Sequence, residues 1–502
     1  MTEKALLPLD EHNLRLQQSV HPTDWENPEP KERYNLVVIG AGTAGLVTAS
    51  AAAGLGAKVA LIERSLMGGD CLNVGCVPSK GIIRSARQVA AVKVAKDFGI
   101  NVPEGVTVDF PKAMERMRKL RADISPVDSA ARFNELGIDV FLGQARFVDD
   151  QTVEVEGAKL NVSRAVICTG ARASAPEIPG LDQVEYLTNE TLFSLTELPK
   201  RFGVVGAGPV GCEMAQTFAR LGSEVTLITS KRGVLPKEDP DAAALVKAAM
   251  EKDGVRIIDG GKQLTVSKAD QVINLNIGDQ EFQVDQLLIA VGRAPNVEGL
   301  NLEGVGVDVS KGGVVVNDRL QTTNKKIFAA GDVCSSYQFT HAADFMARNV
   351  ISNALFFGRA KTSDLIIPWS TYTSPEVAHV GITPQQAEAE GIEIDTFTQD
   401  MTHVDRAILD GETEGFVRVH VKKGSDQILG ATVVAGNAGD FISLYSMAMK
   451  NKIGLKGIGG TIFPYPTQAD AVRKTGDLYN RTRLTPKVKS LMDKFLAWRL
   501  NH

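Results

Sequence analysis

The sequence NLVVIGAGTAGLVTASAAAGLGAKVALIER, residues 35–64, decides the fold of the first part of the chain. A β-branched run ends in a glycine turn, a stretch of small residues follows, and a second β-branched run closes the segment, so this order predicts a complete βαβ unit. The pattern returns in RFGVVGAGPVGCEMAQTFARLGSEVTLIT, residues 201–229. Two such units, about 160 residues apart with alternating strands and helices between them, predict an α/β chain with two doubly wound dinucleotide-binding domains.

The glycines of the first unit have the spacing that a dinucleotide site needs. Gly40 lets the chain turn tightly, Gly42 lets the backbone approach a pyrophosphate, and Gly45 lets the helix pack closely on the sheet. Glu63 ends the second strand 18 positions after Gly45, where a carboxylate can accept hydrogen bonds from an adenosine ribose. An ordinary glycine turn is the alternative interpretation.

The second unit repeats this spacing with Gly206, Gly208 and Gly211. Its second strand lacks an acid at the ribose position, and Lys231 and Arg232 follow just beyond. Cations there can pair with a 2′-phosphate that a carboxylate would repel, so the sequence favours NADPH over NADH. Two solvated loop cations are the alternative.

Composition excludes several classes of protein. The chain has 502 residues, is 43% apolar and 23% charged, and carries a net charge of -5, which argues against a nucleic-acid partner. It has no apolar run of about 20 residues for a membrane span, and its N-terminus lacks the order of a secretory signal. Five cysteines, an odd number with one close pair, indicate redox use in a reducing compartment, so we expect a cytoplasmic protein.

The motif GGDCLNVGCVPSK, residues 68–80, lies just after the first βαβ unit. Cys71 and Cys76 are five positions apart with Gly75 between them, close enough for a small, reducible ring. A helix N-terminus stabilises a thiolate and lowers its pKa. The motif predicts a redox-active cysteine pair, with two buried structural cysteines as the alternative.

This motif resembles the active site of the class I pyridine nucleotide-disulfide oxidoreductases, the family of glutathione reductase, dihydrolipoamide dehydrogenase and mercuric reductase. The resemblance runs from residue 34 onward over nearly all of the chain. It implies FAD as a cofactor, with Cys76 as the sulfur in charge-transfer contact with the flavin and Cys71 as the exposed interchange sulfur. It also implies that Lys80 lies beside the flavin N5 and pairs with Glu213.

The run KIFAAGDV, residues 326–333, ends a predicted strand in Gly331 and Asp332. Asp332 resembles the family residue that hydrogen-bonds the ribityl chain of FAD. His341 and Ala342 are expected nearby, at the N-terminus of the following helix.

The βαβ units and the resemblance together predict five segments along the chain. They are an N-terminal arm (1–33), the first part of an FAD-binding domain (34–188), an NAD(P)-binding domain (189–296), the second part of the FAD-binding domain (297–360) and a C-terminal α+β dimerisation domain (361–502). Three prolines in HPTDWENPEP, residues 21–30, indicate that the arm is extended or loosely docked.

The segment FPYPTQAD, residues 463–470, departs from the pattern of the disulfide reductases. In those enzymes a His-Pro-Thr-x-x-Glu segment comes from the partner subunit, and its histidine protonates the outgoing thiol. Tyr465 stands in the histidine position here and Asp470 in the glutamate position. A phenol with an ordinary pKa of about 10 is a poor general base at neutral pH, so exchange with glutathione or lipoamide should be slow.

Tyrosine at this position, together with YQFTHAADFMAR at residues 337–348, resembles mercuric reductase and its close relatives. Reduction of a thiolate-bound metal ion needs two sulfurs and an electron source but no thiol protonation. Mercuric reductases also have a C-terminal vicinal cysteine pair and an N-terminal metal-capture domain. This chain has its last cysteine at Cys334 and no cysteine in its arm, so we expect less efficient metal delivery.

The sequence therefore predicts an FAD-dependent NAD(P)H oxidoreductase of the mercuric reductase type, with a metal ion or small electrophile as acceptor and no resident metal. The resemblance implies a homodimer in which the segment around Tyr465 completes the partner's site. One alternative is a disulfide reductase of the dihydrolipoamide dehydrogenase or glutathione reductase type. Another is a low-turnover redox-sensing flavoprotein that docks through its ends.

The C-terminal tail, residues 481–502, is basic and has an apolar stripe at helical spacing. We expect the stripe to pack on its own domain or on the dimer mate, with a membrane surface or a partner protein as the alternatives. Its members are Val488, Leu491, Met492, Phe495 and Trp498.

Overall fold

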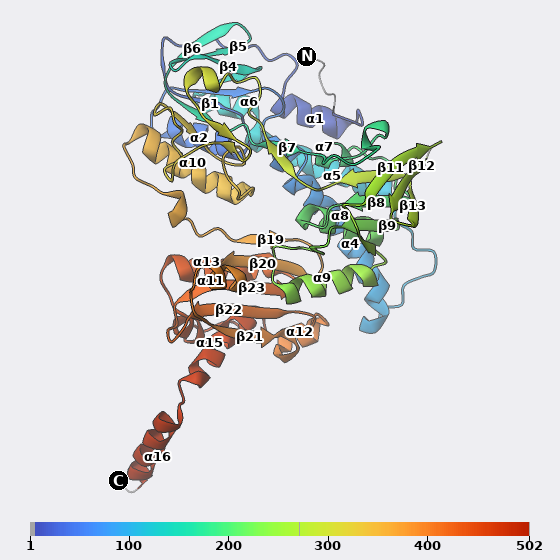
Figure 1. Cartoon of the computed structure of the whole chain (residues 1–502), viewed down its shortest axis with the longest axis vertical. Helices are drawn as coiled ribbons and strands as arrows, with labels where there is room; N and C mark the ends of the chain where they lie inside the picture. The colour runs from blue at the N-terminus through green and yellow to red at the C-terminus, as the bar shows by residue number, and fades with distance from the viewer. Residues whose placement is uncertain (1–5, 271, 501–502) are drawn as a thin grey trace. The chain divides into compact units, whose positions relative to one another are not determined.

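The computed structural model describes residues 6–270 and 272–500, which divide into two compact units (Figure 1). The first unit holds the residues up to 207 together with 214–231 and 254–365. The second holds residues 208–213 and 232–253 and the chain from 366 onward.

The main sheet of the first unit has the strand order β3-β2-β1-β6-β5-β4, and β18 pairs with the carboxyl end of β6. β3, β2, β1, β6 and β18 run parallel, whereas β4, β5 and β6 form an antiparallel meander. The strands are β1 (Tyr34–Ile39), β2 (Val59–Glu63), β3 (Asp139–Leu142), β4 (Ala145–Asp149), β5 (Thr152–Val155), β6 (Ala158–Ile167) and β18 (Ile327–Ala329).

Both faces of this sheet are covered, which is why its central strands are continuous apolar runs. Val37 and Ile39 of β1 pack in a core with Phe147 and Val153 of the meander. The alternate β1 residues point to the opposite face, on which α2 (Thr43–Gly54) and α10 (Thr340–Leu355) pack together (Figure 1). Further helices of this part are α3 (Gly69–Asn73), α4 (Cys76–Val94), α5 (Phe110–Ile124), α6 (Ala130–Glu135) and α7 (Asn189–Leu192).

A second parallel sheet in the first unit contains the second βαβ repeat. Its order is β10-β9-β8-β14, from β8 (Arg201–Val205), β9 (Glu224–Thr229), β10 (Arg256–Asp259) and β14 (Gln286–Ile289). The repeat's helix is α8 (Pro209–Leu221). Smaller sheets pair β11 (Leu264–Ala269), β12 (Val272–Ile277) and β13 (Gln280–Val284); β7 (Ala171–Ala173) and β15 (Arg293–Pro295); and β16 (Val309–Ser310) and β17 (Gly313–Val314).

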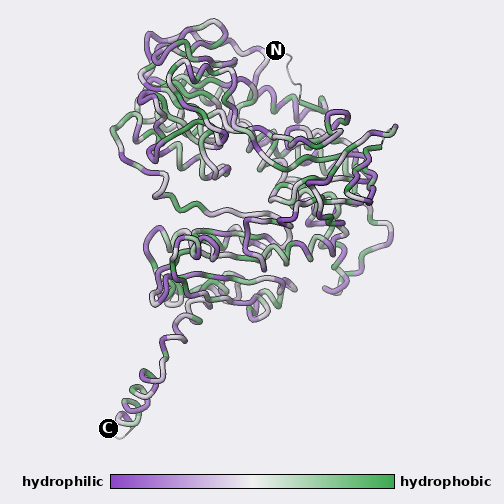
Figure 2. Tube along the Cα trace, in the orientation of Figure 1, coloured by the Kyte–Doolittle hydropathy of each residue, from purple (hydrophilic) through white to green (hydrophobic). Residues whose placement is uncertain are grey.

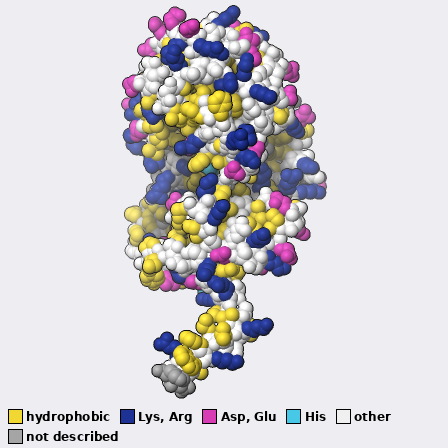
Figure 3. Space-filling model, turned by 90° about the vertical axis from the view of Figure 1, so that its left-hand side faces the viewer, with side chains coloured by type: hydrophobic (Ala, Val, Ile, Leu, Met, Phe, Trp, Pro, Cys, Tyr) yellow, Lys and Arg dark blue, Asp and Glu magenta, His cyan; other side chains and the backbone are white. Residues whose placement is uncertain are grey.

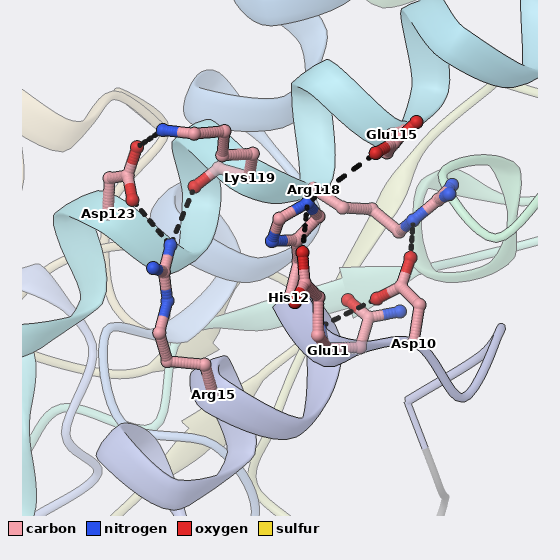
Figure 4. A network of polar contacts seen from close by, with 9 residues as sticks. Asp10, Glu11, His12, Arg15, Glu115, Arg118, Lys119 and Asp123 are labelled. Atoms are coloured by element: carbon pink, nitrogen blue, oxygen red, sulfur yellow. Dashed lines mark hydrogen bonds and ion pairs between the residues drawn. The ribbon is translucent and has the colours of Figure 1, made fainter.

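The N-terminal segment contains a docked helix, so the prediction of an extended or loosely docked arm is wrong for residues 6–33. α1 (Glu11–Val20) starts at Asp10, whose side chain accepts a hydrogen bond from the backbone N–H of Asn13. Leu16 and Val20, one helical turn apart, are completely buried. Figure 4 shows charged side chains of this segment facing α5, among them the ion pair between Asp10 and Arg118.

The second unit is built on an antiparallel sheet of order β19-β20-β23-β22-β21. Its strands are β19 (Trp369–Thr371), β20 (Glu376–Gly381), β21 (Ile394–Asp400), β22 (Phe416–Lys422) and β23 (Ile428–Ala435). Its helices are α9 (Pro240–Lys252), α11 (Pro384–Ala389), α12 (Asp405–Asp410), α13 (Ala438–Lys450), α14 (Leu455–Gly459), α15 (Asp470–Thr482) and α16 (Pro486–Leu500). The buried core joins β22 and β23 to α13, α14 and α15, and Figure 2 shows hydrophobic residues along these strands.

The fold class is confirmed: an α/β chain with two doubly wound nucleotide-binding folds and a C-terminal α+β part. The prediction for the tail is wrong in one respect, because no described residue of α16 is buried and the helix does not pack on its own domain. Its apolar and basic side chains are exposed (Figure 3). Within residues 6–270 and 272–500, no helix combines the length and apolar character needed to cross a bilayer.

Candidate active site

The first glycine turn has the geometry that its sequence predicts. Gly40 has φ +100°, and an added Cβ there would lie 2.5 Å from the carbonyl oxygen of Cys168. A Cβ on Gly45 would lie 1.8 Å from the carbonyl oxygen of Gly40, because α2 packs directly on the turn. A Cβ on Gly42 would approach Gly69 at 3.7 Å, an ordinary contact. Glycine is therefore sterically required at positions 40 and 45.

Glu63 is buried at the end of β2, beside this turn. Its Oε2 accepts a hydrogen bond from the N–H of Ala41 at 2.6 Å, and its Oε1 accepts one from Ser65 at 2.7 Å. Burial raises the pKa of Glu63, although both backbone donors act in the opposite direction. A small pocket opens here, lined by Gly40, Glu63, Arg64, Gln144, Thr169 and Asn296 among others. A steric cradle and a cavity beside a carboxylate fit the adenosine half of FAD.

The second glycine turn resembles the first at its first glycine, which has a positive φ and no room for a Cβ. Gly206 has φ +108°, and an added Cβ would lie 2.4 Å from the carbonyl oxygen of Ala290. A Cβ on Gly208 would meet nothing within 4 Å, and Gly211 lies in the first turn of α8. Lys231 and Arg232 are exposed just beyond β9. Their role at a 2′-phosphate stays a prediction.

Cys71 and Cys76 lie on two consecutive helices, α3 and α4. Cys76 is the first residue of α4, after Gly75 at the N-cap, and its Sγ lies 3.4 Å from Oγ1 of Thr340. Both cysteines are thiols in the structure, and Cys76 is exposed whereas Cys71 is half-buried, the reverse of the order of exposure that the family resemblance implies. Hydrogen bonding to Cys76, together with burial, raises the pKa of Cys71. The pair's proton is therefore held on Cys71, and Cys76 at the helix N-terminus is the sulfur suited to be the thiolate.

A residue that the sequence analysis missed, Arg293, links this cysteine segment to the predicted flavin site. Its guanidinium forms an ion pair with Asp70, the neighbour of Cys71, and its Nε lies 3.6 Å from Oδ2 of Asp332. It also donates to the carbonyl oxygen of Ala171 at 2.6 Å. An arginine directly after the glycine that follows β14 was the available signal, but its hydrogen-bond partners Asp70 and Ala171 lie 223 and 122 positions away in sequence.

Asp332 lies after β18, where α2 and α10 approach each other. Burial raises its pKa to about 6 even though Arg293 lowers it. A Cβ on Gly331, which has φ +84°, would lie 3.2 Å from Cβ of Ala44, so the chain passes close to α2. His341 is exposed and Ala342 buried in the first turn of α10. Both residues lie at the N-terminus of the helix that follows Asp332 in the chain, and their proximity to Asp332 and to FAD stays a prediction.

Lys80 and Glu213 belong to different units, so their predicted pairing stays a prediction. Lys80 lies in α4 about one turn after Cys76 and is half-buried. Glu213 is 5% exposed in α8, and its Oε1 accepts a hydrogen bond from the N–H of Tyr372 at 2.9 Å.

Tyr465 is 74% exposed in the second unit, and its hydroxyl donates a hydrogen bond to Oδ2 of Asp405 at 2.9 Å. That bond and the carboxylate's charge raise the pKa of Tyr465 above its ordinary value. Asp470 lies at the start of α15, where it pairs with Arg473 at 2.6 Å and lies 3.7 Å from Nζ of Lys474. The sequence analysis missed Asp405 because it lies 60 positions from Tyr465 and no motif marks it.

Two family models match the chain. The model described as pyridine nucleotide-disulphide oxidoreductase matches residues 34–347, and the model for that family's dimerisation domain matches residues 367–475. The chain belongs to the pyridine nucleotide-disulfide oxidoreductases. The family is FAD-dependent and uses NAD(P)H, and the dimerisation domain supports a homodimer.

Individual members of this family are similar over most of their length. A mercuric reductase of Lysinibacillus sphaericus is 35% identical over 479 residues, which are 94% of this chain and 87% of the relative. A dihydrolipoyl dehydrogenase of Chlamydia muridarum is 32% identical over 450 residues, 88% of this chain and 95% of the relative. Among solved structures, the HOCl-induced flavoprotein disulfide reductase RclA of Escherichia coli matches with a TM-score of 0.79 at 30% identity, covering 89% of this chain and 100% of RclA. RclA has also been solved as a Cu(II) complex, which matches with the same TM-score at 29% identity.

Proposed function

We propose that this chain is an FAD-dependent NADPH oxidoreductase that passes electrons through Cys71 and Cys76 to a metal ion or a small electrophile, as a mercuric reductase does. The observation that carries the proposal is the pair formed by Cys71 in α3 and Cys76 at the start of α4, in which the pKa of Cys71 is raised by its hydrogen bond to Cys76. Such a pair has one sulfur suited to be a thiolate and one that keeps its proton.

The residues around the first glycine turn would hold the cofactor. Gly40, Gly42 and Gly45 would accept the pyrophosphate, Glu63 the adenosine ribose and Asp332 the ribityl chain. FAD, when bound, would take hydride from the nicotinamide cofactor and supply two electrons.

The cysteine pair would cycle between a disulfide and two reduced sulfurs. Opening the disulfide takes two electrons, leaves Cys76 as a thiolate and places one proton on Cys71. When the disulfide forms again, the pair passes the two electrons on to the acceptor and Cys71 loses its proton. Cys71 would be the sulfur that meets the acceptor, a role implied by the family resemblance.

The nature of the acceptor is inferred from Tyr465. With its pKa raised by Asp405, this phenol keeps its proton at neutral pH and is a poor acid–base catalyst for a leaving thiol. Reduction of a bound metal ion needs no such group. The similarity to mercuric reductases and to RclA, solved with Cu(II), supports a metal ion as acceptor.

Two further parts of the proposal concern assembly and location. In a homodimer of this family's type, the segment around Tyr465 would complete the active site of the partner. We also propose that the enzyme acts in the cytoplasm, because its cysteine usage is that of a reducing compartment. Cell fractionation tests the location.

An anaerobic titration of the FAD-loaded protein with NADPH tests the mechanism. We expect two titratable thiols per subunit and a long-wavelength absorption band from the thiolate–flavin contact. The reduced protein is then mixed in parallel with Hg(II), Cu(II), lipoamide and glutathione disulfide, and the metal ions should discharge the band at least about tenfold faster. Faster discharge by lipoamide or glutathione disulfide would instead indicate a disulfide reductase, and discharge by none of the four a redox sensor.

Variants of the cysteines separate the redox pair from the other thiols. Cys71→Ser and Cys76→Ser should each lower acceptor reduction by a factor on the order of 100 or more, since neither can form the disulfide. Cys334→Ser is the control, because a hydroxyl can still donate to the carbonyl oxygen of Gly331, as the thiol does at 3.5 Å. Equal loss in all three would contradict the assignment.

Lys231 and Arg232 test the choice of nicotinamide cofactor. Replacing both with Ala should raise KM for NADPH by about 10-fold or more, because each ion pair with a phosphate is charge-assisted. KM for NADH should stay within about twofold. Parallel changes for both cofactors would show that these cations do not contact a 2′-phosphate.

A further inference from the structure

The N-terminal helix α1 is joined to the cysteine segment through a buried arginine of α5. Arg121 is 2% exposed. Its Nη2 donates to Oδ1 of Asn13 in α1 at 2.6 Å. Its Nη1 donates to the backbone carbonyl oxygen of Asn73, the last residue of α3, at 2.5 Å. Cys71 lies in that same helix, two residues before Asn73.

Further hydrogen bonds hold Asn13 and Asn73, the two residues that Arg121 connects. Asn13 is 1% exposed and donates through Nδ2 to the carbonyl oxygen of Pro8 at 2.8 Å. Asn73 is 3% exposed and donates to the carbonyl oxygens of Met67 at 3.0 Å and Gly69 at 2.9 Å. These two bonds close the turn that leads into α3. The path from α1 to the Cys71 helix therefore consists of buried hydrogen bonds.

Arg121 carries its charge without an ion pair to a carboxylate among the described contacts, and burial lowers its pKa to about 10. The guanidinium therefore stays protonated at neutral pH and needs its acceptors. Removing one acceptor leaves a buried N–H unsatisfied, which forces the arginine or its neighbours to move.

A second set of contacts ties the end of α1 to the same segment. The N–H of Met67 donates to the carbonyl oxygen of Val20 at 3.0 Å, and the Nδ1 of His21 makes a short contact with the carbonyl oxygen of Ser65. α1 is thus joined to the segment 65–73 twice, directly at its C-terminal end and through Arg121 near its N-terminal end. The family model begins at residue 34, so α1 lies outside the part of the chain that it matches.

We infer that α1 positions the redox pair, with Asn13, Arg121 and Asn73 as positioning residues that fix α3 and with it the sulfur of Cys71. The inference rests on the proposed role of Cys71 and Cys76. The pair's reactivity depends on how closely Cys71 approaches Cys76, since the hydrogen bond between them keeps the proton on Cys71. A looser α3 weakens that bond, which exposes Cys71 to reagents and changes the equilibrium between disulfide and dithiol.

Asn13→Ala tests this inference, with Asn27→Ala as a control for the loss of hydrogen bonds from the N-terminal segment. Asn27 is exposed and exchanges two side-chain hydrogen bonds with the backbone of Leu142 in β3, at 3.0 and 2.7 Å. Both variants lose side-chain hydrogen bonds of the N-terminal segment, and only Asn13→Ala breaks the path to α3. The readouts are the alkylation rate of the NADPH-reduced holoenzyme by iodoacetamide and the midpoint of its dithiol–disulfide equilibrium in a glutathione redox buffer.

We expect Asn13→Ala to change the alkylation rate and the equilibrium constant by about tenfold, the effect of one hydrogen bond to a charged group. Asn27→Ala should leave both within about twofold. Asn13→Asp, which keeps an oxygen acceptor for Arg121, should restore both. Asn13→Ser replaces Asn13→Ala if the latter does not fold.

Two results would overturn the inference: equal changes in Asn13→Ala and Asn27→Ala, or unchanged reactivity in Asn13→Ala. Failure of the proposed function is seen separately, in the wild-type protein. If NADPH generates no alkylatable thiols there, the redox role of the pair is wrong.

Discussion

The two ends of the chain are both helical and both carry apolar residues at helical spacing, yet they are used in opposite ways. α1 buries Leu16 and Val20 completely and supplies a hydrogen-bond partner to a buried arginine. α16 buries no described residue, and its Phe495 and Trp498 are 52% and 56% exposed. α1 is therefore part of the hydrophobic core of the first unit, whereas the described residues of α16 add nothing to the core of the second unit.

An apolar stripe on a helix therefore indicates that some surface covers it, but it does not indicate which surface. For α1 the cover is α5 of the same chain, and ion pairs such as that of Asp10 with Arg118 fix the register between the two helices (Figure 4). In α16 no described residue is buried by the chain itself. Its cations, among them Lys487, Lys494 and Arg499, are exposed.

The largest effect should come from deleting residues 1–33. The deletion exposes the surface under Leu16 and Val20, removes the partner Asp10 from Arg118 and removes the partner Asn13 from Arg121. Losing the buried Leu16 alone costs about 2–5 kcal/mol, and each orphaned buried donor costs about 1–3 kcal/mol more. We expect the thermal midpoint of the holoenzyme to fall by about 10 °C or more, in differential scanning calorimetry. A midpoint within 2 °C of the full-length value, a margin on the order of 1 kcal/mol or less, would contradict the docked helix.

Leu16→Ala should give the next largest effect. Leu16 is completely buried, whereas Leu14 in the same helix is 55% exposed, so Leu14→Ala controls for the change in helix propensity. We expect a loss of about 2–5 kcal/mol for Leu16→Ala and less than about 0.5 kcal/mol for Leu14→Ala. Urea unfolding, followed by hydrogen exchange of α5 amides, measures both. Equal effects would mean that α1 frays from α5 in solution.

The sequence predicts the local parts of the site well. The glycine turns at Gly40 and Gly206 and the pair of Cys71 and Cys76 each lie within one short segment, and the structure has Gly40 and Gly206 in tight turns and Cys76 at a helix N-terminus. Such features depend on backbone freedom and helix position, which neighbouring residues determine.

Long-range pairs could not be read from the sequence. Arg293 meets Asp70 across 223 positions, and Arg121 meets Asn13 across 108. Any of several arginines could take such a partner, and only the folded chain decides which one is buried. The prolines near residue 25 suggested a loose arm, but they interrupt helix only after α1 has ended.

The ion pair of Asp10 predicts a smaller, pH-dependent effect. Partial burial acts to raise the pKa of Asp10, but the backbone N–H of Asn13 and the guanidinium of Arg118 outweigh it, so that the pKa lies below its ordinary value. The stability contributed is therefore fully present above the unfolded pKa of about 4 and is lost as the pH falls through the lower folded value. Asp10→Asn keeps the cap but not the charge. It should be less stable than wild type at pH 7, and the gap in urea midpoint should close below pH 4; a gap independent of pH would show that the charge is not involved.

Deleting residues 485–502 should have the smallest effect on stability, and it tests directly whether α16 is packed against anything. Because no described residue of α16 is buried, the deletion removes no core contact, and the thermal midpoint should change by less than about 2 °C. The measurement is made at several protein concentrations, since a stripe covered by a second copy contributes through dimerisation and makes the midpoint depend on concentration. If the full-length protein shows such a dependence and the truncated one loses it, the dimer mate covers the tail. If the thermal midpoint is independent of protein concentration in both the full-length and the truncated protein, another copy of the chain does not cover the stripe formed by Leu491, Phe495 and Trp498. α1 and α16 then differ in the partner that they pack on as well as in burial.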